Sequence, residues 1–395
     1  MRSIITPEYI KNFSCIAEKC EDHCCHSWDI SIDKSTYKFM TQKSSLKVKS
    51  ADVIMRTKGD TSPYYAKISL NNDGVCPFRE ENGLCEVHKE HGHKRLSQTC
   101  QTYPRTSIIR GNKKEHNLYL SCPEAARQIL LNPTSMQFHQ KNTTNDEFDE
   151  NNYTRPNWHE AVQQFLIDIL FINDISIEQR LFYMGVTLRL IEPHKNNTEE
   201  LHKRLLLCCE KINNNDFEKL YSEQRTSSDF YPSLLIKIFN YHINKDSSHS
   251  YKMASARFHL LYQQLLNALS ITKSDSHKQY KILQHGFNNH YREYFAKNSH
   301  IWINYIIYIF YENDFPSKSM CQVFDNLIDD IFIIRGALSA LASMRPLTDD
   351  DVILVIQTYH RTRTHNKDYI NDIKKIRSEV GINEELLSLM LIKAH

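Results

Sequence analysis

The chain has 395 residues, enough for two or three domains or for one large helical domain with a sizeable core. Its 49 Lys and Arg nearly balance its 47 Asp and Glu, which argues against the strongly basic face that general DNA binding requires. Glycine supplies 9 of the 395 residues, whereas about 7% is usual, and this scarcity argues against Rossmann and P-loop folds, which need clustered glycines.

The first residues show no apolar signal segment, so we expect a cytoplasmic protein with reduced thiols. The segment Ser31–Met40 predicts a short helix, and Tyr64–Leu70 predicts a strand that runs into the turn residues Asn71–Gly74. Further along, Arg105–Arg110 and His116–Ser121 predict the two strands of a β-hairpin.

The composition changes after the hairpin. Residues 140–157 are polar and predict a linker or surface loop. From residue 158 the apolar residues recur with helical spacing, and we expect nine or ten helices and no strand. Three helical stripes carry this pattern: Val162, Phe165, Leu166, Ile169 and Leu170; Phe258, Leu261, Tyr262, Leu265, Leu266 and Leu269; and Trp302, Tyr305, Ile306, Ile309 and Phe310. Thr348 and Asp351 predict the capped start of a late helix that continues through Tyr359.

These patterns predict a mainly α protein with two parts. The expected organisation is a small cysteine-rich α+β metal-binding domain at 1–135, a linker or surface loop at 136–157, and a multi-helical domain at 158–395. The longest apolar stretch, Ile301–Tyr311, is too short to span a bilayer.

The cysteines are placed unevenly along the chain. Three lie in the helical part, at Cys208, Cys209 and Cys321, where we expect core or surface thiols. The other eight lie within the first 122 residues: Cys15, Cys20, Cys24, Cys25, Cys76, Cys85, Cys100 and Cys122. Clustered thiols in a reducing compartment are typical of metal ligands, and four of them suffice for tetrahedral zinc or a cubane iron–sulfur cluster. We therefore interpret all eight as candidate metal ligands.

The spacing does not decide which metal binds. No C-x2-C knuckle of the kind usual in structural zinc sites occurs. The C-x3-C-x2-C pattern of radical S-adenosylmethionine enzymes is also absent, because Ser27 stands where its third cysteine would follow Cys20 and Cys24. The loose spacing suits a cluster held from several loops, and spacing alone leaves iron–sulfur and zinc as alternatives.

Several strings resemble those of proteins with cysteine clusters that chelate zinc or iron. They are Cys20–Cys25, Cys76–His88 and Thr99–Arg105. The whole chain resembles the flagellin lysine-N-methylase family, through these strings and through Cys24–Asp33, Ser121–Arg127, Asn304-Tyr305 and Phe315-Pro316.

The resemblance implies an enzyme that transfers methyl groups from S-adenosylmethionine to the ε-amino groups of surface lysines on flagellin, with a [4Fe–4S] cluster needed for transfer. It favours iron–sulfur over zinc. The first candidates for the four ligands are Cys20, Cys24, Cys25 and Cys100, which fall in the strictest strings.

Lysine methylation requires a neutral amine, so the site must desolvate the amine or offer a base. Tyr103 and Arg105 lie beside Cys100 in the sequence and are the candidate catalytic residues, with Asp22 and Asp33 as further candidate bases. Trp28 is the candidate cofactor-binding residue, since it could stack on an adenine or on the lysine stem, although a core role is an alternative. His23, His26 and His88 are candidate ligands or hydrogen-bond donors near the metal.

The chain lacks the glycine-rich loop with which common methyltransferases bind S-adenosylmethionine, so its pocket must be built differently, and a cleft between the two parts is the natural place. Flagellin is the expected partner, nucleic acid is not, and peripheral membrane association and oligomerisation are left open. The alternative function is that of a non-enzymatic zinc- or iron-chelating protein whose helices dock a partner.

Overall fold

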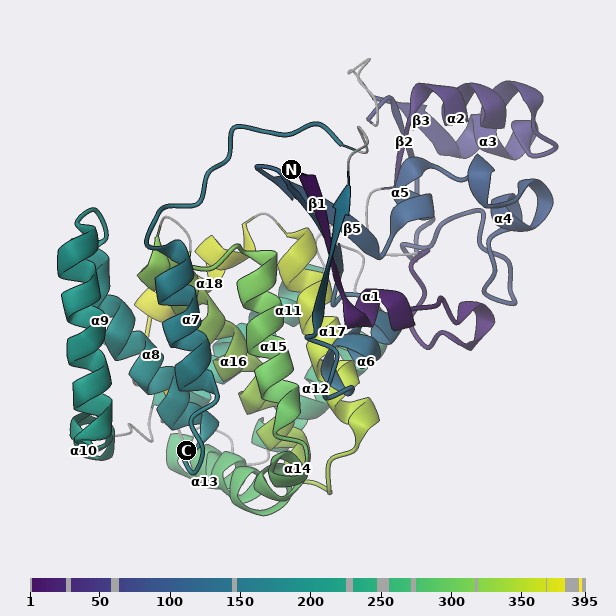
Figure 1. The fold of residues 1–395 in the computed structure, drawn as a ribbon. Helices are drawn as coiled ribbons and strands as arrows, with labels where there is room; N and C mark the ends of the chain where they lie inside the picture. The colour runs from purple at the N-terminus through teal and green to yellow at the C-terminus, as the bar shows by residue number, and fades with distance from the viewer. Residues whose placement is uncertain are drawn as a thin grey trace.

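The structure is a computed structural model that describes residues 2–25, 30–57, 64–143, 148–224, 230–246, 256–270, 275–316, 319–366, 368–380 and 391–392. It is mostly helical, with two small sheets in the first 143 residues, as Figure 1 shows. Of the described helices, none is long and apolar enough to cross a membrane.

Two sheets form in the N-terminal part. A four-stranded sheet has the order β5-β6-β1-β7 and a three-stranded sheet has the order β2-β4-β3. The strands are β1 Arg2–Pro7, β2 Ile30–Ile32, β3 Ile54–Arg56, β4 Ala66–Ile68, β5 Arg105–Arg110, β6 Lys113–Leu118 and β7 Phe138–Thr143. The N-terminal helices are α1 Glu8–Asn12, α2 Lys34–Lys38, α3 Lys47–Val53, α4 Glu86–His91, α5 Gln98–Thr102 and α6 Pro123–Leu130.

The predicted hairpin is present, with its first strand at the predicted residues and its second strand three residues earlier than predicted, at Lys113–Leu118 and not at His116–Ser121. Strands β5 and β6 pair antiparallel from Arg105 opposite Leu118 to Arg110 opposite Lys113. The turn between them contains Gly111, whose φ of +59° is a conformation that glycine adopts at little cost. The predicted strand at Tyr64–Leu70 is also present, in the shorter form of β4. The segment Ser31–Met40 is helical from Lys34 onward, because Ile32 ends β2 and Asp33 caps α2.

The structure differs from the expected loop at 136–157. Its first part is strand β7, which pairs antiparallel with β1 from Arg2 opposite Thr143 to Pro7 opposite Phe138. An edge strand needs no apolar face when its side chains point to solvent, and all residues of β7 except Thr143 are exposed. A polar composition therefore hid a strand that a long-range partner stabilises.

The remainder of the described chain is helical, as predicted, with twelve α-helices rather than nine or ten. They are α7 His159–Leu170, α8 Ile177–Ile191, α9 Thr198–Asn213, α10 Asp216–Glu223, α11 Phe230–Asp246, α12 Ala256–Ser270, α13 Ser276–Gly286, α14 Arg292–Lys297, α15 His300–Glu312, α16 Met320–Ala342, α17 Asp349–His365 and α18 Tyr369–Ser378. Short 3-10 helices lie at Ala17–Lys19, His93–Arg95 and Glu192–His194. Short π-helices lie at Phe39–Lys43 and Phe287–Tyr291.

The sequence stripes correspond to real helix faces. The first lies on α7, the second on α12, where the Phe258 side chain is outside the described residues, and the third on α15. Thr348 and Asp351 form the expected capping box, in which each side chain accepts a hydrogen bond from the other's backbone N–H, and α17 continues beyond Tyr359 to His365. Helix α16 is buried on every side from Leu327 to Ala342, including its charged Asp329, Asp330 and Arg335.

Two hydrophobic cores divide the molecule differently from the expected domain boundaries. The small core comprises twelve residues between Ile30 and Leu96, around the three-stranded sheet. The large core contains the helices after residue 158 together with residues of α1, β6 and α6. The four-stranded sheet is thus joined to the helical body, and only the segment with β2, β3 and β4 packs separately (Figure 1). The boundaries at 135 and 158 stay predictions.

Hydrogen bonds fix the sheet to the helices. The buried Asn304 side chain on α15 donates to the carbonyls of Leu130 and Asn132, at 3.1 and 2.9 Å, where α6 ends. Tyr308, one turn further, donates to the Leu118 carbonyl at 2.9 Å. These contacts explain why the apolar run of α15 carries polar groups, since each satisfies a backbone carbonyl that would otherwise be buried alone.

Candidate functional site

Six of the eight N-terminal cysteines line one cavity. It has a volume of about 220 Å³, and it lies beside the small core. Its cysteines are Cys15, Cys24, Cys25, Cys76, Cys85 and Cys100, and we call it the thiol cavity. Tyr103, Arg105 and His88 also line it, so the structure brings together most of the residues that the sequence singled out.

The cavity is built from loops and short helices that carry cysteines at their ends. Cys85 precedes α4, and Cys100 lies in α5, whose first residue follows the capping Ser97. The Ser97 hydroxyl accepts from the Cys100 N–H at 3.3 Å. The Cys76 N–H donates to the Cys25 carbonyl at 2.7 Å, which holds two distant segments together. Loose sequence spacing is thus compatible with a compact site.

Gly83 allows a loop to approach the cysteine strings. Its φ is +85°, and a Cβ at this position would lie 2.6 Å from the imidazole ring of His23. A larger residue would therefore meet both backbone strain and a steric clash. The glycine permits the 80–84 turn to close against the segment that carries Cys24 and Cys25.

Two of the candidate ligands lie outside this cavity. Cys20 donates to the Asp22 carbonyl at 3.4 Å, and burial raises the pKa of its thiol to about 11. Burial, with a smaller effect of the nearby Cys20, raises the pKa of Cys122 to about 12. The first-choice set Cys20, Cys24, Cys25 and Cys100 is therefore only partly gathered, because Cys20 faces Cys122 and not the thiol cavity.

The thiols of the cavity differ in acidity. Burial raises the pKa of Cys76 and of Cys100 to about 12, and it raises that of Cys85 as well. The hydrogen bond between Cys24 and Cys25 lowers the pKa of Cys24 to about 7, against the effect of burial, and raises that of Cys25. Arg361 also favours the Cys24 thiolate. One thiolate among buried thiols is a site that a soft cation would stabilise.

The donor set of the thiol cavity bears on whether it can hold a metal centre. Among the described residues there is no group of three or more His, Cys, Asp or Glu side chains that could hold a metal ion. Six soft donors nevertheless face one space whose volume is smaller than the roughly 300–1,000 Å³ of pockets for organic ligands. The chemistry of these donors fits a thiolate-held centre.

The candidate catalytic residues have defined environments. Burial raises the pKa of Tyr103 far above its ordinary value, and its hydroxyl lies 3.1 Å from the Ser121 hydroxyl. Tyr103 is therefore a protonated hydrogen-bonding group at neutral pH. The Arg105 guanidinium lies over the Phe13 ring, 4.7 Å from its centroid, and donates to the Phe13 carbonyl at 3.3 Å.

The two candidate bases are engaged elsewhere. Asp33 caps α2, where hydrogen bonds from Ser35 and Thr36 lower its pKa although burial opposes ionisation. The Asp22 carboxylate, 4% exposed, accepts from Arg361 at 2.6 Å and from Gln357 at 2.7 Å. Trp28 and His26 lie outside the described residues, so the structure does not place them.

Arg361 and Gln357 are site residues that the sequence reasoning missed. Both lie on α17, and they contact the Cys20–Cys25 loop across more than 330 positions. Arg361 also donates to the His23 carbonyl at 3.4 Å, and Gln357 donates to that of Ser121 at 2.9 Å. The two residues stand at i and i+4 on one helix face, which the sequence could have shown. The sequence did not indicate that this pair contacts the Cys20–Cys25 loop.

A comparison with known protein families identifies the family of the chain. Residues 163–391, more than half of the chain, match the family model described as FliB lysine N-methylase C-terminal domain. The chain therefore belongs to the FliB lysine N-methylase family.

Curated relatives share part of the chain. A lysine-N-methylase of Salmonella choleraesuis (strain SC-B67) and one of Salmonella typhimurium (strain LT2) are each 33% identical over 150 residues, 37% of this chain and 37% of theirs. A flagellar biosynthetic protein FliU of Salmonella muenchen is 34% identical over 142 residues, 35% of this chain and 83% of that protein. The match thus spans little over a third of the two methylases. No solved structure matches.

Proposed function

We propose that the chain methylates the ε-amino groups of lysines on flagellin, with S-adenosylmethionine as the methyl donor and a [4Fe–4S] cluster held by cysteines of the thiol cavity. The observation that carries the proposal is the family match over 163–391. The names of the relatives, two lysine-N-methylases and a flagellar biosynthetic protein, support the reaction and the substrate.

The thiol cavity supports the cofactor. Cys24, Cys25, Cys76, Cys85 and Cys100 offer more thiols than the four that one cubane needs. Bound there, a cluster would supply iron and electron chemistry that the side chains lack. The low pKa of Cys24 provides a first thiolate for assembly.

The chain's own residues can prepare the lysine. A lysine amine ordinarily has a pKa near 10.4, so it must lose its proton before it attacks a methyl group. The Arg105 cation on the cavity wall disfavours a second cation nearby and so favours the neutral amine. The Tyr103 hydroxyl, which stays protonated, can donate a hydrogen bond or position the substrate, but it is no base at neutral pH.

Anaerobic purification followed by metal and sulfide analysis tests the cofactor. We expect iron and acid-labile sulfide in equal amounts and a brown colour. A colourless protein with stoichiometric zinc would contradict the cluster and favour the chelating, partner-docking alternative. Incubation of the same preparation with methyl-labelled S-adenosylmethionine and flagellin tests the reaction, and flagellin lysines without label would contradict it.

A further inference from the structure

A second cavity lies in the helical body, between α8, the π-helical turn before α14, α14 itself, α15 and α16. Its volume is about 320 Å³, within the usual range for small-molecule sites. It shares no lining residue with the thiol cavity. Figure 1 shows α14 at the opposite end of the molecule from α4 and α5, which carry thiol-cavity residues. We call it the arginine cavity.

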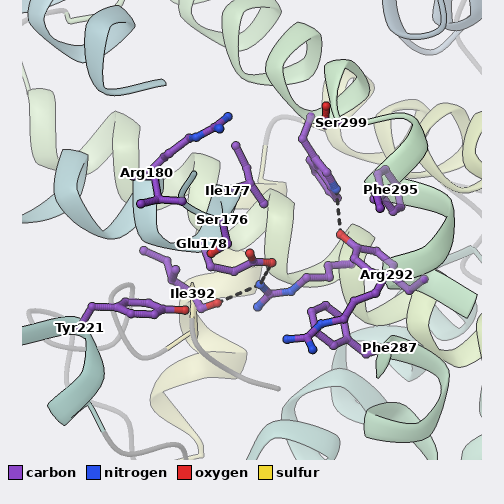
Figure 2. Close-up of a pocket in the computed structure, with 15 residues that line it drawn as sticks. Ser176, Ile177, Glu178, Arg180, Tyr221, Phe287, Arg292, Phe295, Ser299 and Ile392 are labelled. Carbon is purple, nitrogen blue, oxygen red and sulfur yellow. Dashed lines mark hydrogen bonds and ion pairs between the residues drawn. The ribbon is translucent and has the colours of Figure 1, made fainter. Parts of the chain in front are cut away.

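One side of the arginine cavity is aromatic. Phe287, Tyr291, Phe295 and Trp302 follow one another with ring centroids 4.9, 4.4 and 5.6 Å apart. The Trp302 indole N–H donates to the Tyr291 hydroxyl at 2.8 Å, and Figure 2 shows Phe287 and Phe295 of this wall beside Arg292. The rings are thereby held in place and offer a preformed surface on which a flat ligand ring can stack.

The other side is basic. Arg180, Arg292 and Arg335 line the cavity against the single carboxylate of Glu178. The Arg292 guanidinium lies over the Phe287 ring, 5.1 Å from its centroid, where the basic and aromatic sides meet. Three cations and one anion favour an anionic occupant.

Arg335 is the most deeply placed of the three. It is 2% exposed, and it donates to the carbonyls of Leu391 and Ile392 at 2.6 and 2.8 Å and to Glu178 at 3.3 Å. Its Nε is buried and, within the described part of the chain, has no hydrogen-bond partner. A buried guanidinium with an unsatisfied donor costs free energy that a bound acceptor would recover.

Arg180 resembles Arg335 in having a buried Nε, although its side chain is less buried. Its Nε is likewise buried without a hydrogen-bond partner among the described residues. Burial lowers the pKa of its guanidinium. A half-buried cation of this kind is a ready partner for an anion.

Two helix N-termini add to the positive potential. Helix α8, of 15 residues, begins beside its capping Ser176, and α15, of 13 residues, begins after Ser299. Both serines line the cavity. Backbone N–H groups and helix dipoles at such ends stabilise negative charge.

We propose that the arginine cavity binds a small ligand that combines a flat ring with an anionic group, the chemistry shared by nucleotides and by adenosyl amino acids. The ring stacks on the wall formed by Phe295 and Trp302, and the anionic group accepts hydrogen bonds from Arg180 and Arg335. This site is separate from the thiol cavity, and where its ligand is the adenosyl amino acid the inference rests on the proposed function.

Calorimetric titration of the full chain tests the proposal, in the absence of flagellin. The probes are AMP, which carries a phosphate, and S-adenosylhomocysteine, which carries a carboxylate. We expect saturable binding of at least one of them. Binding of AMP identifies phosphate as the source of the anion, and binding of S-adenosylhomocysteine identifies carboxylate. Absence of binding for both probes would overturn the proposal.

Variants locate the binding site. Arg180→Gln is expected to weaken binding at least tenfold, and Arg292→Gln, an exposed position, to weaken it as well. Arg204→Gln, on α9 outside the cavity, is the matched control and should bind as the unmodified chain does. Unchanged affinity in both cavity variants would overturn the assignment even if a probe binds. The titration measures binding alone. A negative binding result would therefore leave the methylation result unaffected, and a negative methylation result would leave the binding result unaffected.

Discussion

The buried ion pair between Asp22 and Arg361 fixes the cysteine loop to α17, and its removal is the sharpest structural test. The Arg361 Nη1 donates to the Asp22 carboxylate at 2.6 Å, and the two side chains are 12% and 2% exposed. We consider Arg361→Met, which keeps an unbranched but shorter side chain and removes its charge. The change leaves the Asp22 carboxylate buried, and it still accepts the hydrogen bond from Gln357.

The expected cost follows from this geometry. Breaking a buried pair by removing one partner costs about 3–5 kcal/mol, because the other charge stays buried. The hydrogen bond from Gln357 places the cost at the lower end, about 3 kcal/mol. A double variant, Asp22→Asn with Arg361→Met, removes the buried charge and should recover at least about 1 kcal/mol of that loss.

Urea unfolding measured by circular dichroism gives the free energies. The control is Arg345→Met, because Arg345 pairs with Asp351 at the start of the same helix but is half exposed, so its loss should cost about 1 kcal/mol or less. If Arg361→Met costs no more than this control, or if the double variant is less stable than Arg361→Met alone, the ion pair does not anchor the loop.

Two further predictions concern the helical core. Burial lowers the pKa of His242 to about 3. Between pH 6.5 and 3 the folded protein therefore keeps this side chain neutral, while the unfolded chain takes up a proton. The contribution to the free energy of unfolding is complete above pH 6.5, falls as the pH drops toward 3, and is lower by about 2 kcal/mol at pH 5. Urea unfolding at pH 8 and pH 5 gives the change in unfolding free energy between the two pH values. This change should be smaller in His242→Gln than in the unmodified chain, and unaltered in His202→Gln, where the histidine is exposed. An equal change in both variants would refute this account. A Cβ at Gly286 would lie 2.0 Å from the Ser339 carbonyl, so Gly286→Ala should force α13 from α16 and lower the unfolding free energy by about 1–3 kcal/mol or more. Gly92→Ala, where a Cβ meets no atom within 4 Å, should cost about 1 kcal/mol through its positive φ, and a similar loss in both would exclude close helix packing as the cause.

Local patterns in the sequence predicted the elements whose cause is local. The stripe on α7, the capping box of α17 and the hairpin of β5 and β6 each depend on residues a few positions apart, and each is present. Strand β7 depends on pairing with β1, more than 130 positions away, and its polar sequence carried no local sign of it. Long-range pairing, not propensity, decides such a strand.

In the candidate site, too, the sequence predicted some features and missed others. The clustering of the cysteines predicted a shared thiol site, and six thiols line one cavity. The cysteine motifs placed Cys20 among the first four candidate ligands, but Cys20 does not line that cavity and lies near Cys122. Asp22 was a candidate base by its neighbours in the sequence, whereas the fold commits its carboxylate to Arg361. Sequence proximity thus indicated which residues gather around one cavity but not which side chains contact each other.

Transfer of a labelled methyl group from S-adenosylmethionine to flagellin lysines by cysteine variants tests the central claim most directly. Three anaerobically prepared proteins are compared: the unmodified chain, the double variant Cys24→Ser with Cys25→Ser, and Cys209→Ser. Cys209 is an exposed cysteine on α9 away from the thiol cavity. We predict that the unmodified chain and Cys209→Ser contain iron and label flagellin, and that the double variant loses both iron and transfer. Labelling by the double variant at the rate of the unmodified chain would contradict a role for the thiol cavity in the reaction.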